Sequence, residues 1–200
     1  GYRALWEGWS GAGFAPGHGP CGSILYFGGG RDYQGNQVVA LNVCGGSSGA
    51  PVWERLSDPY PGAIVAPMAD GAFPDRSPAP PNTTDMLTFD PVNNALVVAA
   101  SNQGGSITTP TPNAWAFDMA RREWRGPFRH RGAEAGTSAF DSLRKVVWFQ
   151  PQQGNSGELT ALDLRTERVA YYGWPTTSGI GISGSTMGYD AKRDRLVLLS

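Results

Sequence analysis

The sequence is poor in the residues that metal chemistry, membrane insertion and nucleic-acid binding require. Two cysteines and two histidines occur among 200 residues, and charged side chains make up only 16% of the chain. The formal net charge of −1 gives no basic surface for a nucleic acid. No apolar run approaches the roughly 20 residues that a membrane-spanning helix needs. We therefore expect neither a nucleic-acid partner nor a membrane span.

Catalytic motifs are equally scarce. His18 and His130 fall in different repeats and on opposite faces, and no His or Cys cluster has the spacing of metal ligands. The Gly-Ile-Ser-Gly run at 181–184 lies in a Gly/Ser-rich stretch that does not resemble a nucleophile elbow. The glycines at 28–30 lead into a strand pattern, whereas a phosphate-binding loop leads into a helix. We expect no catalytic residue, metal or cofactor in this segment.

Turn residues and aromatic residues are what the sequence has in abundance. It contains 28 glycines, 16 prolines and seven tryptophans, and 40% of its residues are hydrophobic. The turn content favours many short strands over long helices. The hydrophobic content argues against disorder. The composition therefore predicts an all-β domain.

A repeat of about 50 residues organises the chain. Each copy begins with small residues, reaches an aromatic residue and a turn, and then enters an apolar run. The aromatic residues Phe89, Phe140 and Tyr189 are 51 and 49 residues apart. Phe14 lies 75 residues before Phe89, and a proline-rich insert accounts for the excess.

Two further strand patterns complete each copy, which gives four short antiparallel strands, the blade of a β-propeller. We expect complete blades at about 9–56, 84–125 and 136–172, partial blades at 1–8 and 184–200, and an insert at 57–83. The chain starts without Met and stops within an apolar run. We therefore expect it to be a segment of a larger propeller, with the remaining blades as its partners.

The repeats resemble a known family. Residues 27–36 read FGGGRDYQGN, an aromatic-Asp pair precedes the apolar run in every copy but the first, and a Trp recurs in the fourth strand. This pattern is similar to the kelch-type propellers of the galactose-oxidase central-domain superfamily, in their degenerate bacterial form. The resemblance covers nearly the whole chain and is specific for the fold but weak for function, because propellers host unrelated activities.

In propellers of this kind, the loops that join strands two to three and strands four to one share the ligand-binding face. Here those loops carry polar and aromatic side chains of the kind that bind sugars or peptides. The resemblance implies ligand-binding roles for Arg31, Asp32, Tyr33, Asn36, Asn102, Gln103, His130, Gln152 and Trp174. The alternative is that Asp32 and Asn36 cap a glycine-rich turn and that the others are solvated loop residues.

Five acidic residues recur in register in the repeats: Asp90, Asp118, Asp141, Asp163 and Asp190. A catalytic role would not repeat five times, whereas a turn role would. A carboxylate after an aromatic residue can accept hydrogen bonds from the amides of a turn. We expect these five residues to be structural.

The insert at 57–83 contains seven prolines. Such a segment cannot pair as a central strand, because proline donates no ladder hydrogen bond. We expect an ordered excursion over the ligand face or the outer rim.

The two cysteines fall in one blade. Cys21 lies between strands one and two, and Cys44 lies between strands three and four, in loops longer than their counterparts. Up-and-down topology brings both loops to one face, opposite the ligand face. We predict a disulfide between Cys21 and Cys44, the alternative being two unrelated buried thiols. A disulfide indicates an oxidising compartment, so we expect an extracellular or secreted protein, including one on a cell or virion surface.

These features favour a non-catalytic binding or structural module outside the cell, such as part of a surface or virion-associated fibre. Its expected partner is a carbohydrate or another protein. The alternative is a copper-radical oxidase or glycan-active enzyme whose catalytic residues lie outside this segment. A copper-radical site needs two His, two Tyr and a Tyr–Cys pair, but only His130 falls on the right face, and Cys21 falls on the wrong one.

Overall fold

The computed structural model describes residues 11–27, 35–61, 70–80, 83–100, 113–130, 133–153, 158–173 and 186–199. Only the backbone is described for residues 100, 133–135 and 151–153. These residues form strands β1 to β14 and contain no helix. Accordingly, the described part of the chain has no helix that is long and apolar enough to cross a membrane.

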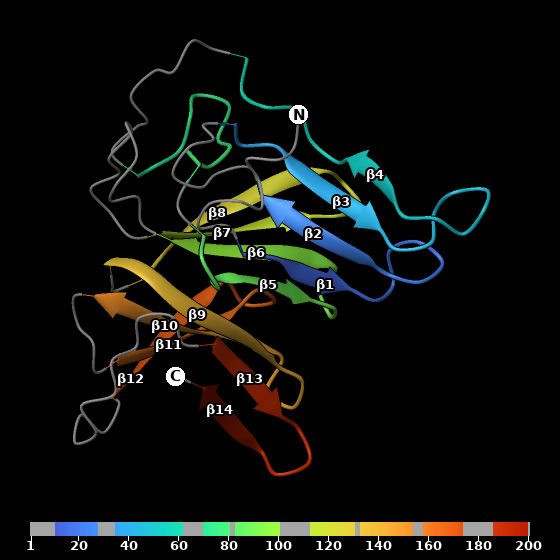
Figure 1. The fold of residues 1–200 in the computed structure, drawn as a ribbon. Helices are drawn as coiled ribbons and strands as arrows, with labels where there is room; N and C mark the ends of the chain where they lie inside the picture. Colours follow the sequence, from blue (N-terminus) through green and yellow to red (C-terminus); the bar gives the residue numbers. More distant parts are fainter. Residues whose placement is uncertain are drawn as a thin grey trace.

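The strands form four antiparallel sheets in chain order, which we call blades 1 to 4 (Figure 1). Blade 1 contains β1 (Gly13–Ala15), β2 (Ser23–Phe27), β3 (Val38–Asn42) and β4 (Val52–Arg55). Blade 2 contains β5 (Leu87–Asp90), β6 (Ala95–Ala100), β7 (Asn113–Asp118) and β8 (Glu123–Arg129). Blade 3 contains β9 (Ala133–Asp141), β10 (Val146–Gln153), β11 (Glu158–Asp163) and β12 (Arg168–Gly173). Blade 4 contains β13 (Thr186–Asp190) and β14 (Arg195–Leu199).

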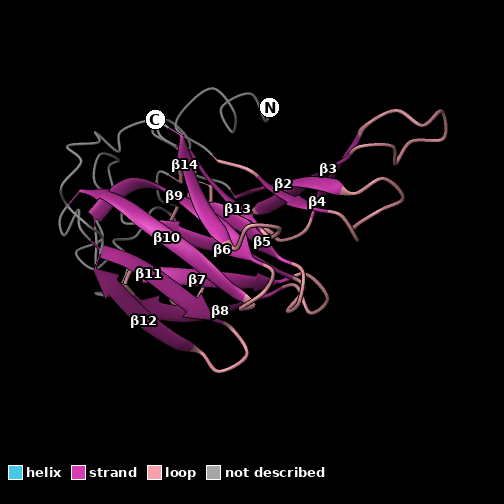
Figure 2. Ribbon diagram, turned by 90° about the horizontal axis from the view of Figure 1, so that it is seen from below, coloured by secondary structure: helices cyan, strands magenta, loops and turns pink. Residues whose placement is uncertain are grey.

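The blades are arranged as a fan around their first strands. Each four-stranded sheet keeps the strand order of the sequence, and β1, β5, β9 and β13 follow one another along the inside of the fan (Figures 1 and 2). Radially arranged antiparallel meanders of this kind are the blades of a β-propeller. The predicted fold class, all-β with four-stranded propeller blades, is confirmed.

Neighbouring blades pack face to face through hydrophobic side chains. One buried cluster joins blades 1 and 2, a second joins blades 2 and 3, and a third joins blades 3 and 4. Each cluster contains side chains of both blades, such as Leu25 and Phe89, Val97 and Phe149, and Trp148 and Leu198. A blade between two others therefore buries both faces of its sheet, which explains why inner strands such as β6 and β7 are buried along their length and do not alternate.

Small and hydroxylic residues allow the first strands to approach one another closely. The Gly11 N–H donates to Thr83 Oγ1 at 2.9 Å, and a Cβ on Gly11 would lie 2.0 Å from the Thr84 carbonyl oxygen. One blade further on, the hydroxyls of Thr88 and Ser138 are hydrogen-bonded at 2.6 Å. The inside of the fan is thus held by hydrogen bonds between side chains too small to push the blades apart.

The five recurring aspartates cap turns, as the sequence predicted. Each carboxylate accepts a hydrogen bond from the backbone N–H two residues further on, at 2.9 or 3.0 Å. The residue four positions after each aspartate has a positive φ, which ranges from 48° at Asn94 to 61° at Lys145. The left-handed conformation is unfavourable for residues other than glycine. Its recurrence at the same position after each capping carboxylate shows that the five hairpins share one geometry.

Two strand boundaries differ from those expected from the sequence. Strand β8 runs on to Arg129, beyond the blade end expected at 125, and β9 already begins at Ala133. The reason is that Phe128 is buried in the cluster between blades 2 and 3 together with Phe149. Burying this ring extends β8 along its neighbour β7.

The predicted disulfide is present. Cys21 and Cys44 are bonded, with their Cα atoms 5.7 Å apart, inside the usual range for disulfides. The connections that carry them, β1–β2 and β3–β4, extend from the same end of blade 1 (Figure 1). The bond therefore ties together the two longest connections at this end of the described structure.

Replacing both cysteines by serine should destabilise the protein by about 3 kcal/mol, because the bond closes a loop whose ends are 23 residues apart. Denaturant unfolding of the oxidised protein and of the double variant measures the difference. Reductant should bring the parent protein to the stability of the variant and leave the variant unchanged. Equal stabilities under oxidising conditions would show that the bond does not constrain the unfolded chain.

Candidate functional site

One end of the sheets carries most of the features that depart from the repeat, and we call it the insert face. It is the end at which β3 and β7 begin and β4 and β8 finish, opposite the turns capped by the five aspartates. Described residues 57–61 and 70–80 of the insert lie against this end through hydrogen bonds to Asn36 and Asn113. The structure thus places the insert over blades 1 and 2 on the face that the sequence predicted for ligand binding.

Asn36 is the main anchor of the insert. Its Nδ2 donates to Ser77 Oγ at 2.8 Å and to the Pro78 carbonyl at 3.1 Å. Its Oδ1 accepts from the Tyr60 N–H at 2.7 Å. The side chain is only 2% exposed. Asn36, a predicted ligand residue, therefore uses its amide to hold the chain over the blade.

The insert has internal order of its own. The rings of Tyr60 and Phe73 are stacked, with centroids 4.6 Å apart and an interplanar angle of 10°. Asn113 Nδ2 donates to the Asp70 carbonyl at 2.6 Å, and Arg76 pairs with the Asp70 carboxylate at 2.9 Å. These contacts replace the ladder hydrogen bonds that a proline-rich segment cannot make.

His130 is buried, whereas the sequence predicted that it would be a ligand-binding residue of a surface loop. It follows β8, is 3% exposed, and its ring centroid lies 6.1 Å from that of Phe149. A ring enclosed between blades 2 and 3 is not presented at the rim.

The other predicted ligand residues cannot be compared with the structure. Gln152 belongs to β10, but its side chain is not described. Arg31, Asp32, Tyr33, Asn102, Gln103 and Trp174 lie outside the described residues. Their binding roles stay predictions.

A polar group that the sequence did not predict lies near the propeller axis, and we call it the axial cluster: Asp85, Thr137, Thr186 and Gln150. The Asp85 carboxylate accepts hydrogen bonds from the Thr137 hydroxyl at 2.5 Å and the Thr186 hydroxyl at 2.7 Å. Asp85 precedes β5 and Thr186 opens β13, so the group is at the insert-face end of the fan. It joins blades 2, 3 and 4 around one carboxylate.

Gln150 adds an amide opposite Thr137 in the neighbouring strand. It pairs with Thr137 across β9 and β10, so both side chains project from the same face of the sheet. The residue is 1% exposed, and neither Oε1 nor Nε2 has a hydrogen-bond partner. A buried amide without partners costs free energy, which is why such groups mark places where water or a ligand binds.

The axial cluster suits polar recognition. It offers a carboxylate acceptor, two hydroxyls and an amide that both donates and accepts. Among the described residues, no three His, Cys, Asp or Glu side chains come together in the way that a metal site requires. Reasoning from repeats missed Asp85, because it belongs to the connection before β5 and has no counterpart in the other copies.

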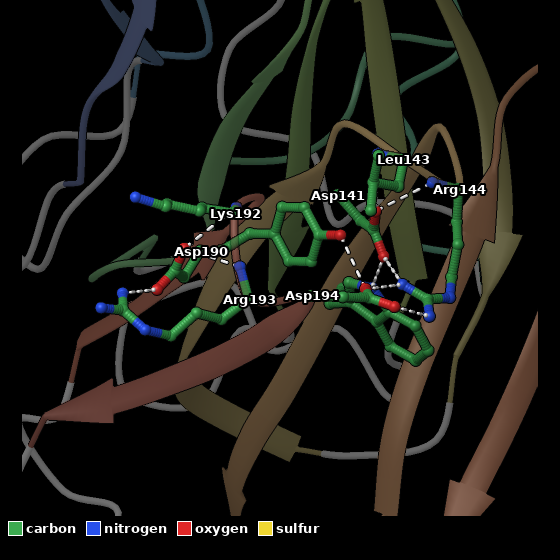
Figure 3. A network of polar contacts seen from close by, with 9 residues as sticks. Asp141, Leu143, Arg144, Asp190, Lys192, Arg193 and Asp194 are labelled. Carbon is green, nitrogen blue, oxygen red and sulfur yellow. Dashed lines mark hydrogen bonds and ion pairs between the residues drawn. The ribbon is translucent and has the colours of Figure 1, made fainter.

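The opposite face carries a polar network between blades 3 and 4 (Figure 3). Arg144 binds both carboxylate oxygens of Asp194, at 2.5 and 2.8 Å, and also reaches Asp141 at 2.9 Å. The Tyr189 hydroxyl donates to Asp194 at 2.8 Å, and the Trp148 indole donates to Asp141 at 3.1 Å. One guanidinium thus connects the first hairpin of blade 3 to that of blade 4.

The network shifts the ionisation of its members. Hydrogen bonds from Arg144 and Tyr189 lower the pKa of Asp194 from 3.8 to about 2. Burial would raise the pKa of Asp141, but hydrogen bonds from Arg144 and Trp148 outweigh it, and the net pKa is lowered. Burial and the neighbouring Asp194 raise the pKa of Tyr189 to about 12. The charged carboxylates are therefore the favoured forms at neutral pH, as a structural role requires.

Comparisons with known proteins name no family for this chain. No protein-family model matches the sequence, and no curated protein matches it. Thirty solved chains are similar in structure. One is a chain from the crystal structure of a nidogen/laminin complex, with a TM-score of 0.48 and 12% sequence identity. The match covers 89% of this chain and 55% of that one, so the chain spans about half the length of its structural neighbour.

Replacing Arg144 by methionine should flatten the acid dependence of stability. The Asp194 pKa is lower in the folded protein, so its stabilisation is present above about pH 4 and is lost as pH falls toward 2. The variant lacks the guanidinium and has less to lose over that range. Melting temperatures between pH 6 and pH 2 measure the effect.

Arg76→Met is the control, because it removes an exposed guanidinium that pairs with Asp70 at 2.9 Å away from this network. It should keep the acid dependence of the parent. Identical pH profiles for Arg144→Met and the parent protein would mean that the Arg144–Asp194 ion pair does not link blades 3 and 4.

Proposed function

We propose that this chain is a non-catalytic binding module of an extracellular propeller and that it binds a protein partner through the insert face. The observation that carries the proposal is the fastening of the insert by Asn36. Three hydrogen bonds converge on one buried amide to hold a proline-rich segment over blades 1 and 2. No counterpart of this segment occurs in the described connections of the other blades.

The shape and chemistry of the insert face favour a protein surface as the ligand. The insert presents exposed charges, such as Arg76, and the stack of Tyr60 on the buried Phe73 supports it from within. The axial cluster lies at the same end of the blades. Loops on a rigid scaffold are where binding residues concentrate. Arg31, Asp32, Tyr33, Asn102, Gln103 and Trp174 lie outside the described residues, and the proposal keeps the binding roles that the sequence predicts for them.

The extracellular location is supported by the disulfide between Cys21 and Cys44, because structural disulfides persist in oxidising compartments. Placement on a cell or virion surface, in a fibre for example, extends the same argument. The remaining blades of a larger ring are further proposed partners.

As part of the same proposal, we assign the blades to the kelch type of the galactose-oxidase central-domain superfamily. The capped aromatic-Asp turns and the fourth-strand residues Trp53 and Trp124 support this assignment. The copper-radical oxidase and other glycan-active enzymes of that class remain the competing function, with catalytic residues outside this segment.

The test is binding of the purified chain to an array of secreted proteins and, in parallel, to a glycan array. We expect saturable binding to a secreted protein that Asn36→Ala weakens at least about tenfold, because the insert loses its anchor. Asp85→Asn should weaken the same binding if the partner reaches the axial cluster. Arg121→Ser is the control, since this exposed side chain lies on the opposite face beside Asp118.

Each of three other outcomes would contradict one part of the proposal. Binding to glycans alone would replace the protein partner by a carbohydrate. Equal weakening by Arg121→Ser would contradict the insert face. Release of a chemically altered product from either array would contradict the non-catalytic function.

A further inference from the structure

The axial cluster is built around a carboxylate that the repeat does not supply. Blade 2 has Asp85 four positions before the aromatic residue of its first strand. The other copies have small residues at this position: Ser10, Gly136 and Ser185. The packing of the first strands therefore does not require a charge here, and Asp85 calls for another explanation.

The backbone that leads to Asp85 is strained. Thr84 has a φ of 44°, in the left-handed region, where a β-branched residue is a clear outlier. Hydrogen bonds hold the chain on both sides: the Gly11 N–H donates to Thr83 Oγ1 at 2.9 Å, and Ser138 Oγ donates to the Asp85 carbonyl at 3.0 Å. Strain persists only where surrounding contacts enforce it, and it is typical of ligand-binding positions.

The hydroxyl protons of the axial cluster are already engaged. Thr137 and Thr186 both donate to Asp85 Oδ2, at 2.5 and 2.7 Å. Within the described part of the chain, Oδ1 accepts no hydrogen bond, and no Lys or Arg pairs with this carboxylate. A hydroxyl has one proton, so each threonine oxygen can only accept from a further group. A ligand therefore meets acceptors and a negative charge, which suit a cation with N–H donors.

The arrangement favours an ammonium group over a guanidinium group. A guanidinium binds a carboxylate best through two parallel hydrogen bonds, one to each oxygen. The two hydroxyls already occupy Asp85 Oδ2, so only Oδ1 is open to a new donor. An ammonium is a compact charge with three donors, and it can bind Oδ1 together with the hydroxyl oxygen of the exposed Thr186.

A metal ion fits the axial cluster less well. Calcium takes about six to eight oxygen ligands, among them several carboxylates. Asp85 is a single carboxylate, and the described residues contain no group of three His, Cys, Asp or Glu side chains that could hold a metal.

A buried amide is an independent sign of a polar ligand. Gln150 lies opposite Thr137, so the two side chains project from the same face of the sheet. Gln150 is 1% exposed, and its Oε1 and Nε2 have no hydrogen-bond partner. Because buried polar groups are almost always paired, this amide indicates a position for a ligand or for a water that accompanies it.

We propose that the axial cluster binds a primary ammonium group, carried either by a lysine side chain of the protein partner or by a free amine. The cluster is formed by three successive blades of this chain, through Asp85, Thr137 and Thr186. The lysine source rests on the proposed function, whereas the ammonium chemistry does not.

The test is titration of the purified chain with n-butylammonium, followed by NMR of the Asp85 backbone amide and the Gln150 side-chain amide. We expect saturable shifts with a millimolar dissociation constant, because the probe has few atoms. n-Butylguanidinium should bind at least about threefold more weakly. Tetramethylammonium has the charge but no N–H donor and should not bind saturably.

Three results of this titration would overturn the proposal. They are equal binding of n-butylammonium and tetramethylammonium, no saturable shift at Asp85 or Gln150, and tighter binding of calcium at the same residues, which would favour a metal ion.

Two variants test the geometry. Asp85→Asn keeps an oxygen that can accept from both threonines, so it should fold but bind n-butylammonium at least about tenfold more weakly. Asp58→Asn is the matched control, because it removes the same charge from an exposed residue of the insert. Thr186→Val frees an acceptor position on Oδ2, so it should raise the affinity for n-butylguanidinium relative to n-butylammonium. Equal weakening by both Asn variants, or unchanged selectivity of Thr186→Val, would contradict the proposed site.

Experiments with a secreted partner separate this inference from the proposed function. Acetylation of the partner's lysines removes their charge, so it should weaken binding to the parent chain but not binding to Asp85→Asn. A partner that depends on Asn36 but not on Asp85, together with n-butylammonium binding, would identify a free amine as the ligand. Binding of n-butylammonium without any protein partner would contradict the proposed function alone.

Discussion

The structure depends on the close face-to-face packing of successive sheets. This packing is possible because small residues lie where blades 1 and 2 meet: Gly11, just before β1, lies directly against the Thr84 carbonyl, and Gly13 in β1 lies beneath Leu96. Once the first strands are close, the large side chains further out interlock and both faces of each inner blade are buried. At roughly 25 cal/mol per Å² of apolar surface buried, these junctions are the main source of stability.

Around this framework the two ends of the sheets have different roles. One end repeats the same capped hairpin, whose carboxylates accept hydrogen bonds from turn amides and arginines, and it links neighbouring blades through Arg144 and Arg122. The other end departs from the repeat, with an insert anchored by Asn36 and a carboxylate, Asp85, shared by three blades. The hairpins at the first end are similar from blade to blade, whereas the connections at the other end differ between blades.

Features that recur with the repeat could be predicted from the sequence. The blades, the capping role of residues such as Asp141, and the pairing of Cys21 with Cys44 all follow from register and topology. Contacts between unrelated segments could not be predicted. Asn36 binds residues about 40 positions away, and the burial of His130 depends on Phe149 of the next blade. The sequence of a single repeat contains no pattern that predicts either contact.

Unfolding of Gly11→Ala tests the close approach of the blades most directly. A Cβ there would lie 2.0 Å from the Thr84 carbonyl oxygen, so blades 1 and 2 must separate or distort. We expect a loss of about 1–3 kcal/mol in unfolding free energy. Gly17→Ala, where a Cβ meets nothing within 4 Å, should change stability by less than about 0.5 kcal/mol. Equal stabilities of the two variants would contradict the central role of blade packing.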